Sequence, residues 1–302
     1  MTHTESNSSE SSSFHNLASA SDSIRAVFLD IDGTLVGPTE TVSPAVRRAI
    51  DRVRARGVEV VLCTGRARHT AEPIAHQIGP PLGYVVTSNG GVTMHLGRNE
   101  VLHARLLPIP VALQVVRAIL AVGVEPYIYE SAISGDMEGA RVLHHPDLPV
   151  GPFATRPRYR PHATLTEDLP FEPVSINAFG PIEKMRSLVD RLTRQLPEGV
   201  TLIQTGSSDH WGIEIFSGGV SKRLGLETLA AHLHLKQSQI MAVGDHMNDL
   251  EMIAWAGVGV AMGNALPEVK AVANWITTSV EEDGVAHALA HFLPNCFATT
   301  TP

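Results

Sequence analysis

The stretch AVFLDIDGTL, residues 26–35, decides the fold of this chain. Its apolar start, residues 26–29, predicts a buried strand of a parallel sheet. The strand ends in Asp30 and Asp32, and ligands of open α/β sheets bind at the carboxyl ends of the strands. A divalent metal would hold one acid as a carboxylate and leave the other free to carry a proton. The pair therefore suggests a carboxylate nucleophile with a neighbouring acid/base group, against the plainer alternative of an Asp-Gly turn.

Three further segments place reactive groups after strands or at helix starts. In IMAVGDHMND, residues 240–249, another apolar strand ends in acids, and we expect Asp245 to complete a Mg²⁺ site begun by Asp30. In VVLCTGR, residues 60–66, the Thr64 hydroxyl and the N–H groups opening the next helix suit a phosphoryl oxygen. In GGVSK, residues 218–222, Lys222 brings a compact positive charge after a Gly-Gly turn.

Four segments resemble, in the same order, the four motifs of the haloacid dehalogenase (HAD) superfamily of phosphohydrolases. They are DIDGT at Asp30, TGR at Thr64, the Lys222 segment and GDHMND at Asp245. The likeness is to the Cof-like branch, which has a large α/β cap inserted between the second and third motifs. It covers about residues 24–292 and includes TSNGG at 87–91, VAMGNA at 260–265 and EDGVA at 282–286.

The strand–helix–strand alternation after the first motif independently predicts a doubly wound parallel α/β sheet. Ser43 and Pro44 suit the N-cap and first position of a helix, and a strand follows at residues 58–62. The resemblance implies a Rossmann-like core of residues 24–90 and 209–292 with an α/β cap of residues 91–208. Residues 1–23 are rich in serine and expected to be disordered, and residues 293–302 to be a loose tail.

Composition narrows the class of protein. The 302 residues are 43% hydrophobic and carry a formal net charge of −8, which argues against a partner that is a nucleic acid. No apolar stretch reaches the roughly 18 residues that span a bilayer, and the N-terminus lacks the features of a secretion signal. The two cysteines form no disulfide framework. We therefore expect a cytoplasmic protein with no membrane partner.

The resemblance also implies a mechanism. Asp30 would attack phosphorus to form an aspartyl-phosphate, and Asp32 would protonate the departing alcohol and then activate water. Mg²⁺ would be bound by the Asp30 carboxylate, the Asp32 backbone carbonyl and Asp245, and would offset the repulsion between nucleophile and phosphate. The remaining implied roles are phosphate binding by Thr64, Gly65, Lys222 and Asn248, and orientation of Lys222 or of the metal shell by Asp249.

The substrate is less well specified. Arg66, Asp136, Arg141 and His144 are candidates for contacts with the rest of a small phosphorylated molecule, such as a sugar phosphate. The leading hypothesis is a Mg²⁺-dependent phosphomonoesterase. A phosphosugar mutase with the same nucleophile, and a phosphometabolite-binding regulator without turnover, are the alternatives. The 15 histidines lack the spacing of a zinc site, and the sequence leaves the oligomeric state open.

Overall fold

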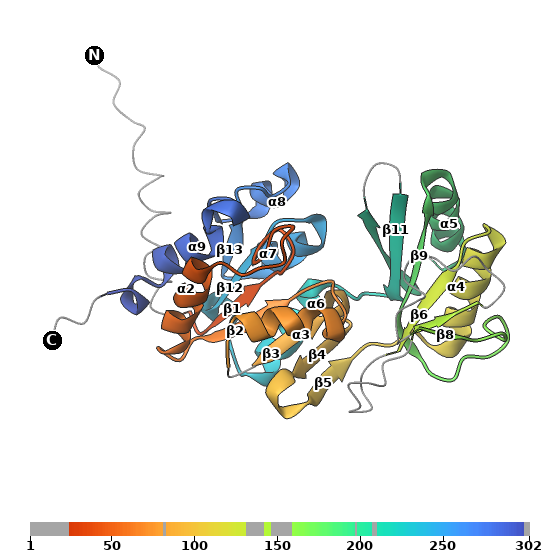
Figure 1. The fold of residues 1–302 in the computed structure, drawn as a ribbon, viewed down its shortest axis with the longest axis horizontal. Coiled ribbons are helices and arrows are strands. Elements are labelled where there is room, and N and C mark those ends of the chain that lie inside the picture. The colour runs from red at the N-terminus through yellow and green to blue at the C-terminus, as the bar shows by residue number, and fades with distance from the viewer. Residues whose placement is uncertain are drawn as a thin grey trace, which may run out of the picture. The chain divides into compact units, whose positions relative to one another are not determined.

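A computed structural model describes residues 24–80, 83–130, 142–145, 159–196, 198–206 and 210–298 (Figure 1). The described residues form two compact units. The first is built from residues up to Thr64, Thr70–Val85 and the part from Leu226 onward, and the second from Gly65–His69 and Val86–Gly225. The expected disorder of residues 1–23 lies outside the described residues.

An eight-stranded sheet carries the first motif at its centre, in the order β14-β13-β12-β1-β2-β3-β4-β5. Strand β1 pairs in parallel with both β12 and β2, and β13 continues the parallel order from β12 to β14. The strands are β1 (Ala26–Leu29), β2 (Glu59–Cys63), β3 (Tyr84–Thr87), β4 (Val92–His95), β5 (Glu100–Ala104), β12 (Ile240–Gly244), β13 (Val258–Ala261) and β14 (Trp275–Ile276). The predicted α/β fold with a parallel, Rossmann-like core is confirmed.

Helix α2 begins where the sequence places its capping residues. The Ser43 hydroxyl accepts a hydrogen bond from the Val46 N–H at 3.1 Å, with Pro44 as the first helical residue of α2. The helices associated with this sheet are α2 (Pro44–Arg54), α3 (Arg68–Gln77), α6 (Lys222–His232), α7 (Leu250–Trp255), α8 (Pro267–Val272) and α9 (Gly284–Phe292). Short 3₁₀ turns are η1 (Ser88–Gly90), η2 (Leu96–Arg98), η4 (Gln237–Gln239), η5 (Met247–Asp249), η6 (Val280–Glu282) and η7 (Pro294–Cys296).

A second sheet of six strands lies in the second unit, in the order β10-β11-β9-β6-β7-β8. Its pairs are antiparallel except for β7 with β8. The strands are β6 (Pro126–Glu130), β7 (Val142–His144), β8 (Tyr159–Pro161), β9 (Pro173–Pro181), β10 (Val200–Gly206) and β11 (His210–Ser217). Helices α4 (Ile109–Ala121) and α5 (Ile182–Gln195) pack on this sheet.

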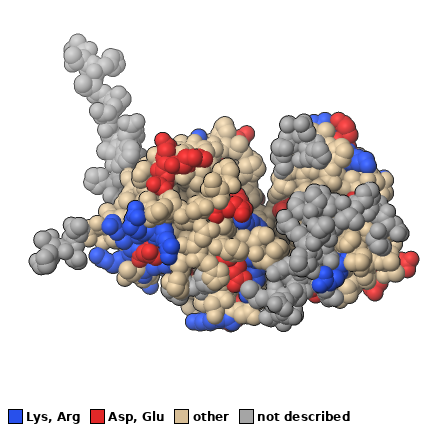
Figure 2. All heavy atoms as spheres, viewed as in Figure 1, with Lys and Arg blue, Asp and Glu red and all other residues tan. Residues whose placement is uncertain are grey.

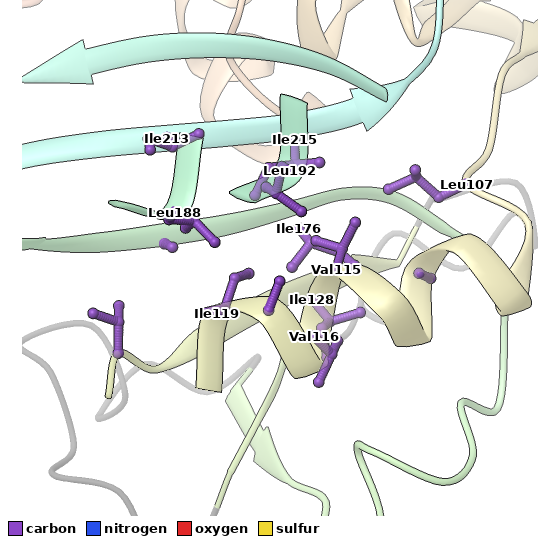
Figure 3. Close-up of a cluster of buried hydrophobic side chains, with 14 of the residues drawn as sticks. Leu107, Val115, Val116, Ile119, Ile128, Ile176, Leu188, Leu192, Ile213 and Ile215 are labelled. Atoms are coloured by element: carbon purple, nitrogen blue, oxygen red, sulfur yellow. The ribbon is translucent and has the colours of Figure 1, made fainter. Parts of the chain in front are cut away.

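The core of the second unit is the apolar layer between this sheet and its two helices (Figure 3). Alternate residues of each strand point into the layer, because successive side chains of a strand face opposite sides. The labelled contributors are Leu107, which precedes α4, Val115, Val116 and Ile119 from α4, Leu188 and Leu192 from α5, and Ile128, Ile176, Ile213 and Ile215 from the strands. Residues between these strand positions therefore face away from the helices.

Strand pairing differs from the expected boundaries in two places. Strands β4 and β5, expected in the cap, form an antiparallel hairpin at the edge of the first sheet. Strand β11, expected in the core, pairs with β9 and β10 in the second sheet. The expected domain boundaries were placed from the positions of the motifs in the sequence. The sheet to which a strand belongs depends instead on which neighbouring strand it pairs with in the fold.

The C-terminal segment is more ordered than expected. Turn η7 opens it, and the Phe297 ring lies 5.4 Å from the Arg52 guanidinium carbon on α2. Stacking a cation on an aromatic face is favourable, so this contact ties the segment to α2. The expectation of a loose tail is wrong for residues 293–298, and residues 299–302 lie outside the described part.

Positively charged side chains gather over α2 on the face shown in Figure 2. Part of this charge serves the fold: the Arg54 guanidinium donates to the carbonyls of Ile78 and Gly79 at 2.8 and 3.1 Å. Partial burial lowers the pKa of Arg54 below its ordinary value. Within the described ranges, no helix is both long and apolar enough to cross a bilayer.

Candidate active site

The loop after β1 separates the two aspartates of the first motif. Asp30 is 3% exposed, and its N–H donates to the Val243 carbonyl of the neighbouring strand at 3.0 Å. Asp32 is exposed. The turn closes through the Gly33 N–H, which donates to the Val36 carbonyl at 2.9 Å. One carboxyl group is thus held in the protein interior while the other is open to solvent.

The loop after β12 is held by its own acid. Asp249 is fully buried, and its Oδ2 accepts hydrogen bonds from the N–H groups of Asp245 and His246 at 3.1 and 3.0 Å. Gly244 leaves the space for this, because a Cβ there would lie 2.5 Å from the Asp249 Cγ. The Thr34 hydroxyl donates to Asp245 Oδ1 at 3.5 Å and so links the two loops. Asp249 therefore shapes the turn that presents Asp245.

Carboxylate oxygens of Asp30, Asp245 and Asp249 all lie within 4.8 Å of one another. Three acids at this separation repel one another unless a cation or protons neutralise them. Oxygen ligands on two parallel strand ends suit a hard divalent cation such as Mg²⁺. The donor set thus fits the metal that the sequence suggests. Asp249 joins the predicted Asp30 and Asp245 in this group, whereas the expected ligand from Asp32 is its backbone carbonyl.

Asn264 is a residue of this site that the sequence reasoning missed. Its Nδ2 donates to the Gly33 carbonyl at 2.9 Å and to Asp245 Oδ2 at 3.3 Å. Its Oδ1 accepts from the Val280 N–H at 3.0 Å. Asn264 therefore connects the loops after β1 and β12 with the turn η6. The signal was present in VAMGNA, which belongs to the family likeness, but no role was assigned to it.

The second motif lies at the end of β2. Thr64 is fully buried, whereas Arg66 is partly exposed. The Arg66 carbonyl accepts from the Ser88 N–H at 2.9 Å. Gly65 packs against Asn89, since a Cβ at Gly65 would lie 3.1 Å from the Asn89 amide atoms. The loop after β2 thus packs against the turn after β3, within the second unit.

Lys222 is the first residue of α6 and is 1% exposed. The Ser221 hydroxyl accepts from the Leu224 N–H at 3.3 Å, as an N-cap residue does. Asn248, the other predicted phosphate ligand outside the acidic group, is partly exposed in η5.

Glu214 on β11 is a second residue that sequence reasoning missed. Its Oε2 accepts from Asn89 Nδ2 at 3.0 Å. Burial raises the pKa of Glu214 to about 7, although the Asn89 hydrogen bond and the charge of Lys222 both lower it. In the sequence, Glu214 is only a polar residue between two isoleucines, as expected of any strand with one buried face.

Of the predicted specificity residues, His144 is described and Asp136 and Arg141 lie outside the described residues. His144 is buried on β7 with its Nδ1 3.2 Å from Glu125 Oε1. The other oxygen of Glu125 accepts from the Tyr127 hydroxyl at 2.8 Å. These three residues form a buried polar group on β7, on β6 and at the residue just before β6.

Comparison with known proteins agrees with this geometry. The family model described as haloacid dehalogenase-like hydrolase matches residues 27–289. A protein named HMP-PP phosphatase from Serratia proteamaculans (strain 568) is 32% identical over 290 residues, which cover 92% of this chain and 98% of that protein. A protein of Bacillus subtilis (strain 168) named 5-amino-6-(5-phospho-D-ribitylamino)uracil phosphatase YitU is 27% identical over 266 residues, 88% of this chain and 96% of its own.

Among solved structures, a haloacid dehalogenase-like hydrolase from Bacteroides thetaiotaomicron aligns with a TM-score of 0.76 at 25% identity. The alignment covers 89% of this chain and 99% of that one. Both the sheet core and the second sheet are thus shared with a known enzyme fold. The chain belongs to the haloacid dehalogenase-like hydrolase family and is one of its Cof-like phosphatases.

Proposed function

We propose that this protein is a Mg²⁺-dependent phosphatase that hydrolyses small phosphorylated metabolites through an aspartyl-phosphate on Asp30. The observation that carries the proposal is the group formed by Asp30, Asp245 and Asp249 after β1 and β12. When bound there, Mg²⁺ supplies positive charge that offsets the repulsion between an anionic nucleophile and a phosphate.

The two aspartates of the first motif divide the chemistry. A carboxylate oxygen of Asp30 attacks phosphorus, the new O–P bond forms, and the P–O bond to the leaving group breaks. The Asp32 carboxyl gives its proton to the departing oxygen and then takes a proton from the water that attacks phosphorus. Water thereby releases inorganic phosphate and restores the Asp30 carboxylate. The burial of Asp30 and the exposure of Asp32 support this division.

Other residues hold the transferring group. We assign the phosphate oxygens to the Thr64 hydroxyl, the Gly65 N–H, Lys222 and Asn248. A buried lysine serves this role well, because its charge is less screened by solvent than that of a surface lysine. Arg66, partly exposed beside them in sequence, takes a minor part.

The names of the relatives support the substrate class that we propose. The names of the two relatives describe phosphatases of small phosphorylated compounds, and we extend that class to this chain. His144, as a buried polar residue of the second sheet, is assigned to recognition of the leaving group. Arg66, Asp136 and Arg141 remain specificity candidates on the sequence argument.

Phosphate release from a panel of phosphorylated sugars, pyrimidines and an aryl phosphate tests the proposed function. With Mg²⁺ we expect turnover of at least one member, and chelation of the metal by EDTA should lower it at least tenfold. Restoring Mg²⁺ should recover the rate, whereas Ca²⁺ should not, since it prefers a larger and more flexible coordination shell. Turnover unaffected by EDTA would contradict the proposed role of the acidic group.

A further inference from the structure

Glu214 faces away from the helices of its sheet. Its neighbours Ile213 and Ile215 belong to the apolar layer against α4 and α5 (Figure 3). The alternation of side chains along β11 therefore turns Glu214 to the opposite side of the sheet. A carboxyl group in a half-buried strand position is costly to ionise unless nearby groups stabilise its charge.

Asn89 fixes one oxygen of this carboxyl group. Its Nδ2 donates to Glu214 Oε2 at 3.0 Å, and its own backbone is held in the left-handed region with φ of 54°. The next residue, Gly90, packs so closely that a Cβ there would lie 1.9 Å from the Ser221 carbonyl oxygen. The turn that carries Asn89 thus packs, through Gly90, against the residue immediately before Lys222.

Asn177, on the neighbouring strand β9, offers an oxygen that can accept a hydrogen bond from a protonated Glu214. It is the residue of β9 directly opposite Glu214 in the antiparallel register. Side chains of such pairs have Cβ atoms about 5 Å apart. Asn177 is 7% exposed, and its Oδ1 has no hydrogen-bond partner among the described residues. A carboxylate cannot donate to this oxygen, but a protonated carboxyl group can.

Among the described residues, the charge that alters the pKa of Glu214 is that of Lys222. Lys222 exerts an attractive field on it from the start of α6, while its strand partners, Ile203 on β10 and Asn177 on β9, carry no charge. Burial raises the pKa of Glu214 to about 7 against the lowering effects of Asn89 and Lys222. The group therefore changes its charge near pH 7, within the field of the lysine assigned to phosphate.

We propose that Glu214 is a positioning residue whose proton controls how much of the Lys222 charge is available to phosphate. Asn89 donates to one carboxyl oxygen of Glu214, and the proton on the other oxygen is donated to Asn177 Oδ1. When Glu214 is neutral, it does not compete with phosphate for the Lys222 ammonium group. When Glu214 ionises, it becomes a second anion that competes with phosphate for the same ammonium group. This inference rests on the proposed function for the role of Lys222, and the following experiments distinguish the two.

The first experiment measures the proton directly. Protein labelled with ¹³C at the glutamate carboxyl carbons is titrated by NMR, with Glu214→Gln identifying the signal. We expect a midpoint near pH 7, and Lys222→Met should move it upward, because the lysine favours the ionised form. A midpoint in the ordinary range of glutamate, or one unmoved by Lys222→Met, would overturn the proposal. This titration does not require the protein to turn over a substrate, so its result does not depend on the reaction assigned to Asp30.

The second experiment measures the consequence. The dissociation constant of inorganic phosphate is measured by calorimetry in Mg²⁺ buffer from pH 6 to pH 8.5, and the wild-type value is divided by that of Glu214→Gln. The ratio cancels the titration of phosphate itself. It should rise about tenfold with pH, which corresponds to a coupling of one pKa unit. The control Glu130→Gln, at the end of β6 in the same sheet, should give a constant ratio. A constant ratio for Glu214→Gln would overturn the proposal.

Discussion

Asp30→Asn is expected to lower the rate of Mg²⁺-dependent phosphate release by roughly 10⁴-fold or more, because it removes the attacking oxyanion. The amide has nearly the shape of the carboxyl group, so packing around this buried position is kept. It also retains a carbonyl oxygen for a metal. The loss should therefore fall on the rate constant of turnover, while substrate affinity changes much less.

The matched control for this variant is Asp51→Asn on the exposed side of α2. It makes the same chemical change away from the acidic group and should retain the wild-type rate. Both variants should show wild-type circular dichroism and thermal unfolding. Equal rates for Asp30→Asn and wild type would exclude Asp30 as the nucleophile.

Gly33→Ala is expected to raise the Mg²⁺ concentration required for activity and to lower turnover roughly 100-fold, as a displacement of about 1 Å can do. Gly33 has φ of 78°, and a Cβ there would lie 2.2 Å from Asp245 Oδ2. The methyl group must push the Asp245 carboxylate away from the position where it meets Asp30. Mg²⁺ titration of the rate measures this effect separately from folding.

The control variant Gly57→Ala separates the displacement of the Asp245 carboxylate from the backbone strain that any alanine has at a positive φ. Gly57 also has φ of 78°, but a Cβ there would meet nothing within 4 Å. Both variants therefore bear the same conformational cost, on the order of 1 kcal/mol, and should lose similar stability from it. We expect Gly57→Ala to keep the wild-type Mg²⁺ requirement. If Gly33→Ala keeps it too, Asp245 has no part in binding the metal.

The sequence predicted those features that depend on local patterns. Asp30 and Asp245 each follow a short apolar strand, and the pairing of β1 with β12 brings these strand ends together. Ser43 caps the helix predicted to follow it. In each case the residues that carry the signal are neighbours in the chain, so the pattern can be recognised without the fold.

Features that depend on distant partners were not predicted. Glu214 acquires its unusual environment from Asn89, which is 125 residues away in the sequence, and from the register with Asn177. Asn264 meets the Gly33 carbonyl across 231 residues. Strands β7 and β8 have three residues each, too few to show a period of two in a stretch that otherwise lacks one.

Trapping the phosphorylated protein tests the central claim most directly. In Asp32→Asn the group that activates water is gone, while an aryl phosphate has a leaving group that needs little help from an acid. Mixing this variant with 4-nitrophenyl phosphate and Mg²⁺ should give a rapid release of one nitrophenol per chain. Mass spectrometry after acid quenching should then locate one phosphoryl group on Asp30. Nitrophenol release by Asp32→Asn with no phosphoryl group on Asp30 would contradict the account.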